Sequence, residues 1–190
     1  MNISGIIKSS FIDYPGKICT VVFLAGCNFR CGYCHNPELV KDKNIFPVIS
    51  INEFISFLNR RKKFLDAVCI SGGEPTLHPD LPHLIKKIKD MGFEIKLDTN
   101  GTNPQMLKSL IEEGLLDYVA MDIKGPLDRY AAIVRHSVDL AAVRESAGVL
   151  IQETKKSGLN CEFRTTVCRE LLTETDLGGF ENSWIIRIKL

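Results

Sequence analysis

Three of the seven cysteines of this chain, Cys27, Cys31 and Cys34, lie within eight residues of one another. Three residues separate the first pair and two separate the second, and the loop directly follows an apolar run, Thr20 to Leu24. A strand that ends in such a loop can turn several thiolates toward one point. Clustered thiolates are typical ligands of zinc and of iron–sulfur clusters, so this loop is the strongest candidate for chemistry in the sequence.

Two kinds of metal site fit these residue types. A tetrahedral zinc ion would need a fourth ligand, which His35 could supply. However, His35 adjoins Cys34, and adjacent residues in a tight loop seldom both face one metal. The other site is a 4Fe–4S cube held by three cysteines, with one iron left open for a ligand that is not protein. Such a cluster can pass an electron to a molecule bound at its open iron, and the odd number of cysteines favours this interpretation.

The cysteine loop resembles the signature of the radical S-adenosylmethionine (SAM) superfamily, including an aromatic residue, Tyr33, before the third cysteine. Its continuation, Cys34-His35-Asn36-Pro37, is similar to the activases of glycyl-radical enzymes. The resemblance runs from about Ser4 to Asp176. It points to the activating protein of anaerobic ribonucleoside-triphosphate reductase, which is related to pyruvate formate-lyase activase.

This resemblance implies a fold, a reaction and partners. The fold would be α/β, a partial open (βα)6 barrel of the TIM-like radical SAM type. Cys27, Cys31 and Cys34 would hold a 4Fe–4S cluster that cleaves SAM reductively to methionine and a 5′-deoxyadenosyl radical. That radical would take a hydrogen atom from a backbone glycine of anaerobic ribonucleoside-triphosphate reductase. The electron would come from a flavodoxin- or ferredoxin-type donor, and the enzyme would be an oxidoreductase.

Strand-like and helix-like segments alternate about five times with short loops, which is typical of parallel βα units. A capping box at Ser50 to Glu53 and an Asn103-Pro104 pair predict two helix starts, and Asp80 and Asp139 predict two more. Residues 38–47 read as irregular. The predicted strands are 3–9, 18–24, 67–70, 93–97, 118–121 and 161–167.

Unusual residues come directly after four of these strands. They are the cysteine loop, Gly72 to Glu74, Asp98-Thr99 and Asp122 to Lys124. In parallel βα architectures, chemistry gathers at the carboxyl ends of the strands. The pattern therefore predicts one active site that includes all four segments.

Gly72 and Gly73 lack a Cβ atom, so the backbone there can approach a ligand closely. It could hydrogen-bond an amino-acid ammonium group, with Glu74 bracing the loop. Taken alone, Gly-Gly-Glu-Pro would be a plain turn before a helix. The resemblance instead assigns this segment to the methionyl amino group of SAM.

Asp98 and Asp122 end neighbouring strands, so their carboxylates should converge, although each could also be a helix or turn cap. In the resembling activases, the matching Asp-Thr and Met-Asp pairs hold a monovalent cation beside the cofactor carboxylate. This implies the same role for Asp98, Thr99, Asp122 and the backbone carbonyl of Met121.

Two cations at strand ends, Lys124 and Arg164, could balance the carboxylate of the cofactor, and arginine is the better suited to bidentate contact. By the resemblance, Tyr33 would lie against the adenine. No histidine pair and no nucleophile with a partnering base can be argued from the sequence. We therefore assign no catalytic side chain, as expected where the cofactor supplies the hard chemistry.

The chain has 190 residues, of which 45% are hydrophobic and 25% charged, with a net charge of +1. This predicts a single radical SAM domain over residues 1–190, with an N-terminal hairpin within 1–18. The charge offers no electrostatic case for nucleic acid or a membrane, and no apolar run approaches the ~20 residues of a membrane span. We read no signal peptide and expect a cytoplasmic protein. The remaining cysteines read as buried thiols: Cys19, Cys69, Cys161 and Cys168.

Residues 177–190 depart from the pattern of the resembling proteins, which continue with a full helix and a sixth strand. Gly178-Gly179 breaks the helical pattern, and Trp184 to Ile188 is strand-like. A mean helix of about 11–12 residues and a mean strand of about 5–6 together exceed the length of chain after Asp176. We therefore expect the barrel to lack its last βα unit.

Two other functions stay open. One is a small-molecule radical SAM enzyme such as 7-carboxy-7-deazaguanine synthase, which would act without a protein partner. The other is a zinc-binding interaction module, which would be colourless and carry about one zinc ion.

Overall fold

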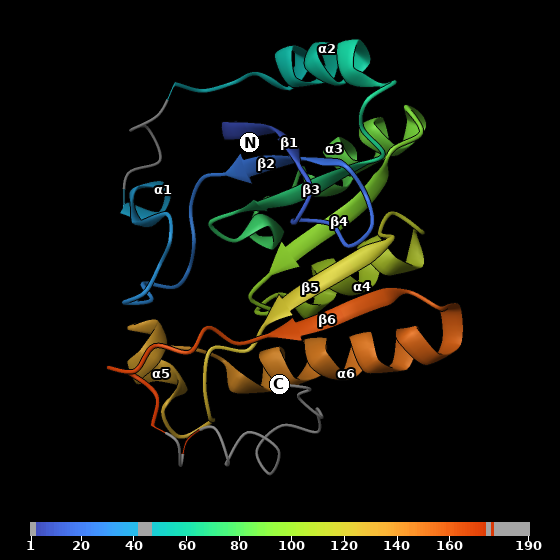
Figure 1. The fold of residues 1–190 in the computed structure, drawn as a ribbon. Helices are drawn as coiled ribbons and strands as arrows, with labels where there is room; N and C mark the ends of the chain where they lie inside the picture. Colours follow the sequence, from blue (N-terminus) through green and yellow to red (C-terminus); the bar gives the residue numbers. More distant parts are fainter. Residues whose placement is uncertain (1–2, 42–46, 174–175, 177–190) are drawn as a thin grey trace.

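The computed structural model describes residues 3–41, 47–173 and 176. Within them the chain forms one six-stranded sheet in the order β1-β2-β3-β4-β5-β6 (Figure 1). The strands are β1 (Ile3–Ser10), β2 (Cys19–Leu24), β3 (Ala67–Gly72), β4 (Glu94–Thr99), β5 (Tyr118–Asp122) and β6 (Asn160–Arg164).

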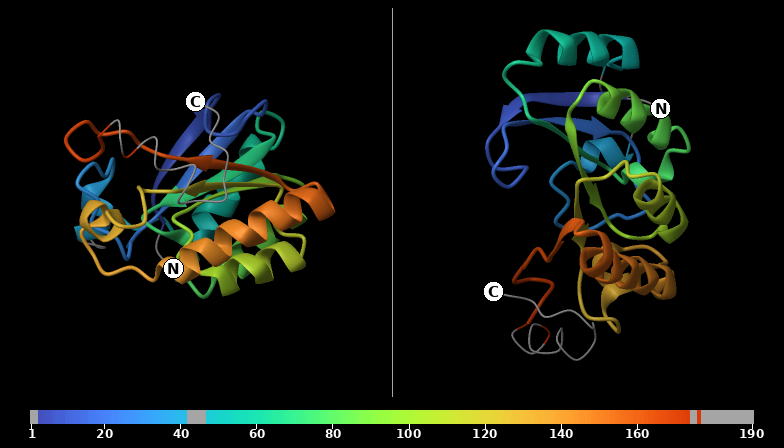
Figure 2. Two further views of the ribbon diagram at one scale, coloured as in Figure 1. Left: turned by 90° about the horizontal axis from the view of Figure 1, so that it is seen from below. Right: turned by 90° about the vertical axis from the view of Figure 1, so that its right-hand side faces the viewer.

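Helices follow the strands in the alternation that the sequence predicts. Figure 2 shows α3, α4 and α6 on one side of the curved sheet. The helices are α1 (Pro37–Lys41), α2 (Ile51–Arg61), α3 (Leu81–Asp90), α4 (Pro104–Glu112), α5 (Tyr130–Val134) and α6 (Leu140–Ser157), with a 3-10 turn, η1 (Pro75–Leu77). No helix in these ranges is long and apolar enough to cross a membrane.

The sheet topology confirms the predicted open α/β barrel. Strand β1 pairs with β2 in antiparallel fashion, as the predicted hairpin requires. Each later strand pairs in parallel with the one before it. The register places Leu24 opposite Gly72 and Asp122 opposite Arg164, so the carboxyl ends of these strands meet at one edge of the sheet.

The alternation of side chains along each strand gives the sheet two different faces. One face contributes the residues that pack with the helices, among them Val68, Ile70 and Leu97, and all three are fully buried. The opposite face carries a smaller cluster that includes Tyr14, Cys19 and Cys69. The main core therefore lies between sheet and helices, as in other layered α/β domains.

Local capping explains where several helices begin. Ser50 and Glu53 form the predicted capping box at the start of α2. The carboxylate of Asp139 accepts hydrogen bonds from two amides of α6. Helix α3 also begins where predicted, but Asp80 makes no capping hydrogen bond. Proline at the second helical position, Pro82, removes one of the two N–H groups that such a cap could engage.

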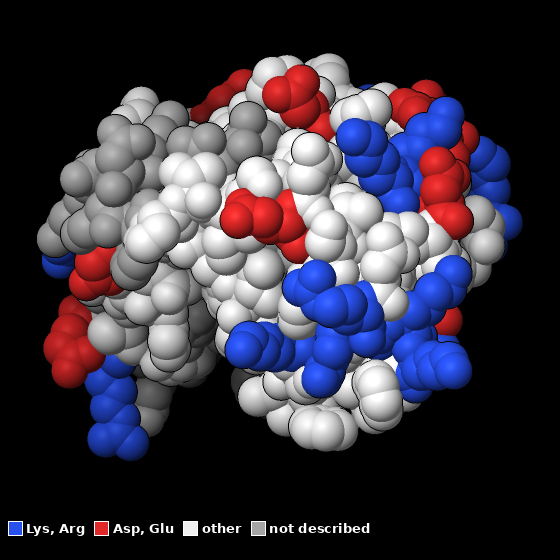
Figure 3. Space-filling model, turned by 90° about the horizontal axis from the view of Figure 1, so that it is seen from above, with Lys and Arg blue, Asp and Glu red and all other residues white. Residues whose placement is uncertain are grey.

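The end of α2 is basic, and Figure 3 shows Lys and Arg side chains gathered on the face that includes this helix. Arg60 and Arg61 lie in its last turn, where positive charge complements the helix dipole. The guanidinium of Arg61 donates a 2.6 Å hydrogen bond to Ser9 Oγ. This contact ties α2 to β1.

Three sequence predictions about elements were wrong. Residues 38–47 were expected to be irregular, yet α1 forms there with Leu39 and Val40 buried. Helix α5 was not expected at all, because five residues are too few to show a helical period. Strand β6 ends at Arg164 rather than at residue 167. The predictions for residues 177–190 lie outside the described residues.

Candidate active site

A cavity of about 190 Å³ opens at the carboxyl ends of the parallel strands. The three cysteines of the loop, Cys27, Cys31 and Cys34, line this cavity together. The same cavity brings together nearly all the other residues that the sequence predicts for the site: Tyr33, Gly72, Gly73, Glu74, Asp98, Thr99, Asp122, Lys124 and Arg164.

Met121 is the predicted site residue that does not line the cavity. It is fully buried in β5, opposite Thr99 in the register. Its side chain packs against Gly101, where an added Cβ atom would lie 2.1 Å from Met121 Cε. The role suggested for its backbone carbonyl stays a prediction.

The cysteine loop is held by α1 and by the end of α5, the two helices that the sequence did not reveal. The amide of Gly26 donates a 2.8 Å hydrogen bond to the carbonyl of Leu39 in α1. The amide of Arg30 donates one of the same length to the carbonyl of Val134 in α5. These contacts orient the loop from both sides.

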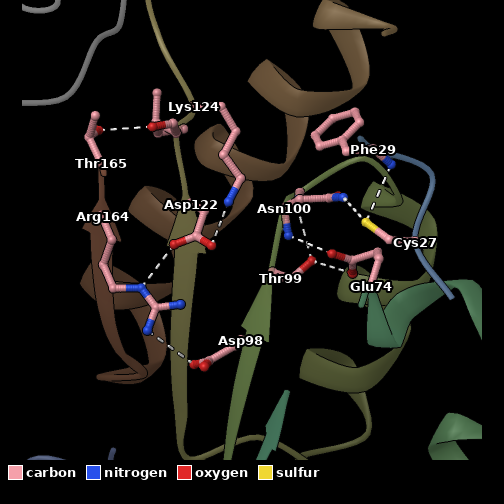
Figure 4. Close-up of polar contacts among 12 residues, drawn as sticks. Cys27, Phe29, Glu74, Asp98, Thr99, Asn100, Asp122, Lys124, Arg164 and Thr165 are labelled. Atoms are coloured by element: carbon pink, nitrogen blue, oxygen red, sulfur yellow. Dashed lines mark hydrogen bonds and ion pairs between the residues drawn. The ribbon is translucent and has the colours of Figure 1, made fainter. Parts of the chain in front are cut away.

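The thiol of Cys27 accepts hydrogen bonds from two neighbouring groups. Its Sγ accepts from the amide of Phe29 at 3.3 Å and from Asn100 Nδ2 at 3.9 Å (Figure 4). Burial raises the pKa of the Cys27 thiol to about 11 and also raises that of Cys31. Because a metal binds the thiolate, metal binding here must release protons.

The end of β3 lies directly against the end of β2, and this explains the two glycines. The amides of Gly73 and Glu74 donate to the carbonyls of Leu24 and Gly26, each at 2.8 Å. A Cβ atom on Gly73 would lie 1.9 Å from the carbonyl oxygen of Gly26. Gly72 has φ +123°, a conformation that L side chains rarely adopt. The glycines thus permit contact between two strand ends, in addition to any approach of a ligand.

Glu74 braces this segment as the sequence predicts. Its side chain is 1% exposed and accepts hydrogen bonds from both neighbouring elements. Oε1 accepts from Thr99 Oγ1 at 2.8 Å and from Thr76, and Oε2 accepts from the amide of Asn100 at 2.6 Å (Figure 4). Burial raises the pKa of Glu74 above its ordinary value, although these hydrogen bonds oppose the shift. Glu74 therefore joins η1 to the end of β4.

Asp98 and Asp122 converge at the cavity through a shared arginine (Figure 4). Arg164 Nε donates to Asp122 Oδ1 at 2.9 Å, and Arg164 NH1 lies 3.5 Å from Asp98 Oδ1. Lys124 Nζ donates to Asp122 Oδ2 at 2.9 Å. Burial raises the pKa of Asp122, but the positive charges of Lys124 and Arg164 outweigh it, so the net pKa is below its ordinary value. Asp122 is thus held as a carboxylate.

Comparison with known proteins assigns a family to this arrangement. The family model described as the Radical SAM superfamily matches residues 21–163. The chain belongs to the radical SAM superfamily. Membership implies a 4Fe–4S cluster and SAM as cofactors and makes the protein an enzyme of the radical SAM class.

Relatives place the chain among the glycyl-radical enzyme activating enzymes. A protein of Methanocaldococcus jannaschii with that provisional name is 40% identical over 177 residues, which are 92% of this chain and 72% of the relative. The pyruvate formate-lyase-activating enzyme of Clostridium pasteurianum is 34% identical over 130 residues, 64% of this chain and 52% of that enzyme. The chain thus spans about half the length of the second relative.

Solved structures agree with the fold. The AdoMet-bound structure of native anSMEcpe matches with a TM-score of 0.63 at 18% identity, over 85% of this chain and 48% of that one. The SAM-bound structure of SuiB from Streptococcus suis matches with a TM-score of 0.56 at 16% identity, over 86% of this chain and 36% of that one. At such identities the likeness shows the fold alone.

The residues present fit the cofactors of the family. Three thiols line one cavity, and Cys27 already accepts N–H donors, which suit the negative charge of a thiolate. Within the described ranges, no group of three or more His, Cys, Asp or Glu side chains is arranged to hold a single metal ion.

Sequence reasoning missed an amide network that supports the cysteine loop. Asn100 Nδ2 donates to Asn28 Oδ1 at 2.9 Å, and Asn28 Nδ2 donates to Thr102 Oγ1 at 2.8 Å. The signal for it was available, because Asn28 follows the first cysteine and Asn100 follows Asp98-Thr99. The network joins the cysteine loop to the segment after β4.

It also missed Lys96, whose Nζ pairs with Asp98. Lys96 lies two residues before Asp98 on β4, and side chains two apart share one face of a strand. The signal for this contact was a lysine that alternates with the buried apolar residues Ile95 and Leu97 of β4.

Proposed function

We propose that this protein is a glycyl-radical enzyme activase in which Cys27, Cys31 and Cys34 are the protein ligands of a 4Fe–4S cluster. The observation that carries the proposal is the shared cavity: three thiols lie beside the backbone segment braced by Glu74 and beside the charged strand ends. This combination provides a cluster site and a site for an amino-acid cofactor in one place.

When bound, a 4Fe–4S cluster reduced by one electron supplies that electron to SAM, which is cleaved to methionine and a 5′-deoxyadenosyl radical. The hydrogen atom that the radical takes comes from a glycine Cα of the partner, which is left as a glycyl radical. The protein's own contribution is binding and orientation, as is general for cofactor enzymes.

We propose a counterpart in the cavity for each part of the cofactor. The backbone at the end of β3, at Gly72 and Gly73, would accept hydrogen bonds from the methionyl ammonium group. Arg164 and Lys124 carry positive charge for the carboxylate, and Tyr33 would contact the adenine. Lys124 Nζ lies 6.0 Å from the centroid of the Tyr33 ring. This proximity supports a single binding surface for the carboxylate and the adenine of the cofactor.

A monovalent cation beside the cofactor, which the resemblance suggests, is not part of this proposal. Four of the oxygens that would hold it already have partners: Asp98 Oδ1, both carboxylate oxygens of Asp122 and Thr99 Oγ1. Asp98 Oδ1 pairs with Lys96 and Arg164, and both oxygens of Asp122 accept from cations. Thr99 Oγ1 donates to Glu74 and accepts from the amide of Gly101.

The partner we propose is anaerobic ribonucleoside-triphosphate reductase, with a flavodoxin- or ferredoxin-type protein as electron donor in the cytoplasm. Support comes from the family and from the similarity of the cysteine loop and of the segment from Ser10 to Lys17 to those of its activating protein.

Anaerobic reconstitution tests the proposal. We expect a brown protein with about four irons and four sulfides, which forms 5′-deoxyadenosine from SAM when reduced. Mixing with the reductase should then produce a glycyl radical, detected by electron paramagnetic resonance. A colourless protein with about one zinc would contradict the proposal. Turnover of a pterin with no protein partner would favour a small-molecule radical enzyme instead.

A further inference from the structure

Lys96 is a buried lysine that the proposed chemistry does not use. Its side chain is 2% exposed, and lysine is almost never fully buried unless it is paired. Its Nζ forms an ion pair with Asp98 Oδ1 and lies 5.8 Å from the centroid of the Tyr118 ring. Removing such a charge from water is costly, so a buried lysine needs a structural or functional reason.

Lys96 begins a chain of ion pairs that crosses three strands. Asp98 on β4 is shared between Lys96 and Arg164, and Arg164 on β6 also binds Asp122 on β5. Lys124 completes the chain at Asp122 Oδ2. Three cations therefore face two carboxylates at the end of the sheet, and Figure 4 shows the part of this chain from Asp98 to Lys124.

Glu162 is the other carboxylate near Lys96, and it contributes less to this balance. Its Oε1 lies 4.0 Å from Lys96 Nζ, and its side chain is 37% exposed. The side chain of Asp98 is 15% exposed and lines the cavity. Because water screens exposed charges more strongly, Asp98 is the dominant partner of Lys96.

Counted without the more distant Glu162 and without Glu74, the chain of ion pairs itself carries one more positive than negative charge beside the cavity. A cofactor carboxylate would meet that excess at Arg164 and Lys124, both of which line the cavity. Without Lys96, the two remaining cations would be balanced by Asp98 and Asp122. An entering carboxylate would then face a rim with no excess charge, unless another cation entered beside Asp98.

We propose that Lys96 is the resident cation of the cofactor site: acting through Asp98, it makes SAM binding independent of monovalent metal ions. Lys96 does not line the cavity itself, so it is a positioning residue rather than a catalytic one. The identity of the ligand, SAM, rests on the proposed function. The position of the Lys96 ammonium group beside Asp98 is independent of the proposed function.

The first test measures SAM affinity of the reconstituted full chain in potassium, sodium and choline chloride at equal ionic strength. The wild type should change less than about twofold among the three salts. Lys96→Gln should bind about tenfold more weakly in choline, because the carboxylate of SAM would meet one positive charge fewer beside the cavity, and potassium or sodium should restore most of the loss. Lys96→Arg, which keeps the charge, should behave as the wild type does.

Lys89→Gln is the matched control. It removes the same charge from an ion pair with Asp117, at the opposite end of the strands, where the lysine side chain is 27% exposed. This variant should show no dependence on the type of cation. Loss of SAM affinity by the wild type in choline, or equal weakening of Lys96→Gln in all three salts, would overturn the proposal.

A second measurement does not need SAM. The melting temperature of the cofactor-free protein should rise when potassium replaces choline for Lys96→Gln, but not for the wild type or Lys89→Gln. If no variant binds SAM, the proposed function fails while this measurement still decides the role of Lys96. If Lys96→Gln does not fold, a potassium-dependent melting temperature of the wild type would reject the proposal, and its absence together with a wild-type-like Lys96→Arg would support it.

Discussion

The strands β3, β4 and β5 carry acidic residues at both ends, and the two ends use them differently. At the amino ends, Asp66 accepts from the amide of Ile18 at 2.9 Å, and Asp117 accepts from the amide of Ile95 at 2.7 Å. Glu94 accepts from Lys17 Nζ at 2.6 Å and from the hydroxyl of Tyr14. These carboxylates accept hydrogen bonds from neighbouring groups of the protein, and they stabilise the edge of the sheet formed by the amino ends.

At the carboxyl ends, the acidic residues are Glu74, Asp98 and Asp122, and all three line the cavity. Glu74 is 1% exposed, whereas the side chain of Glu94 at the other end is 39% exposed. Acidic residues of the same strands thus bind neighbouring groups of the protein at one end and line the candidate site at the other. The direction of the parallel strands decides which of the two ends forms the candidate site, because their carboxyl ends lie beside the cysteine loop.

The largest effect should come from the cysteine loop itself. Cys31→Ala should reduce the iron content of the reconstituted protein to background, because the proposed cluster would lose one of three protein ligands. Cys161→Ala, in β6, is the control and should bind iron as the wild type does. Iron and sulfide analysis measures both. Normal iron content in Cys31→Ala would show that Cys31 is not a ligand of the cluster. The proposed difference between the two ends of the strands would then be rejected.

The next largest effect should be a difference in the free energy of unfolding between glycine variants at the two ends of the strands. Gly73→Ala places a Cβ atom 1.9 Å from a backbone oxygen, so we expect a loss of about 3 kcal/mol or more in the free energy of unfolding. Gly114, before β5, has φ +66° and open space around it, so Gly114→Ala should cost only about 1–2 kcal/mol. Urea unfolding of both variants measures the difference. Equal losses would mean that the close contact between β2 and β3 relaxes easily.

Replacing one carboxylate at each end separates binding from stability. Asp122→Asn should weaken SAM binding about tenfold with unchanged iron content, because Lys124 and Arg164 lose the carboxylate that orients them, and this loss of orientation outweighs the gain in net positive charge. Asp117→Asn should leave SAM binding unchanged and lower the free energy of unfolding by about 1 kcal/mol. Calorimetric titration and urea unfolding measure the two quantities. Normal SAM affinity in Asp122→Asn would refute its proposed role.

The smallest effect concerns the pH dependence of the amino end. The hydrogen bond from Lys17 lowers the pKa of Glu94 below its ordinary value of 4.5. A carboxyl with a lowered pKa stabilises the fold above pH 4.5, and this contribution is lost as pH falls through the lowered pKa. Glu94→Gln should therefore be less stable than the wild type at pH 6 by under about 1 kcal/mol, since the pair is partly exposed. The difference should shrink in urea unfolding at pH 3, and a constant difference would contradict this origin.

Much of this molecule is determined by local sequence. The alternation of strand-like and helix-like segments and the capping box at Ser50 predict the parallel βα units, and the cysteine spacing with the clusters after four strands predicts most of the residues that line the cavity. These features are readable because hydrophobic period and turn residues act over a few neighbouring positions.

The tertiary structure decided the features that depend on distant partners. Helices α1 and α5 are too short to show a period, and they hold the cysteine loop through backbone hydrogen bonds to Gly26 and Arg30. In the sequence, Lys96 is only one residue of a strand. The sheet brings Arg164 of β6 within 3.5 Å of Asp98, and Asp98 also pairs with Lys96. Such pairings form between residues far apart in the chain, so the charge balance of the site is set by the sheet and not by any one segment.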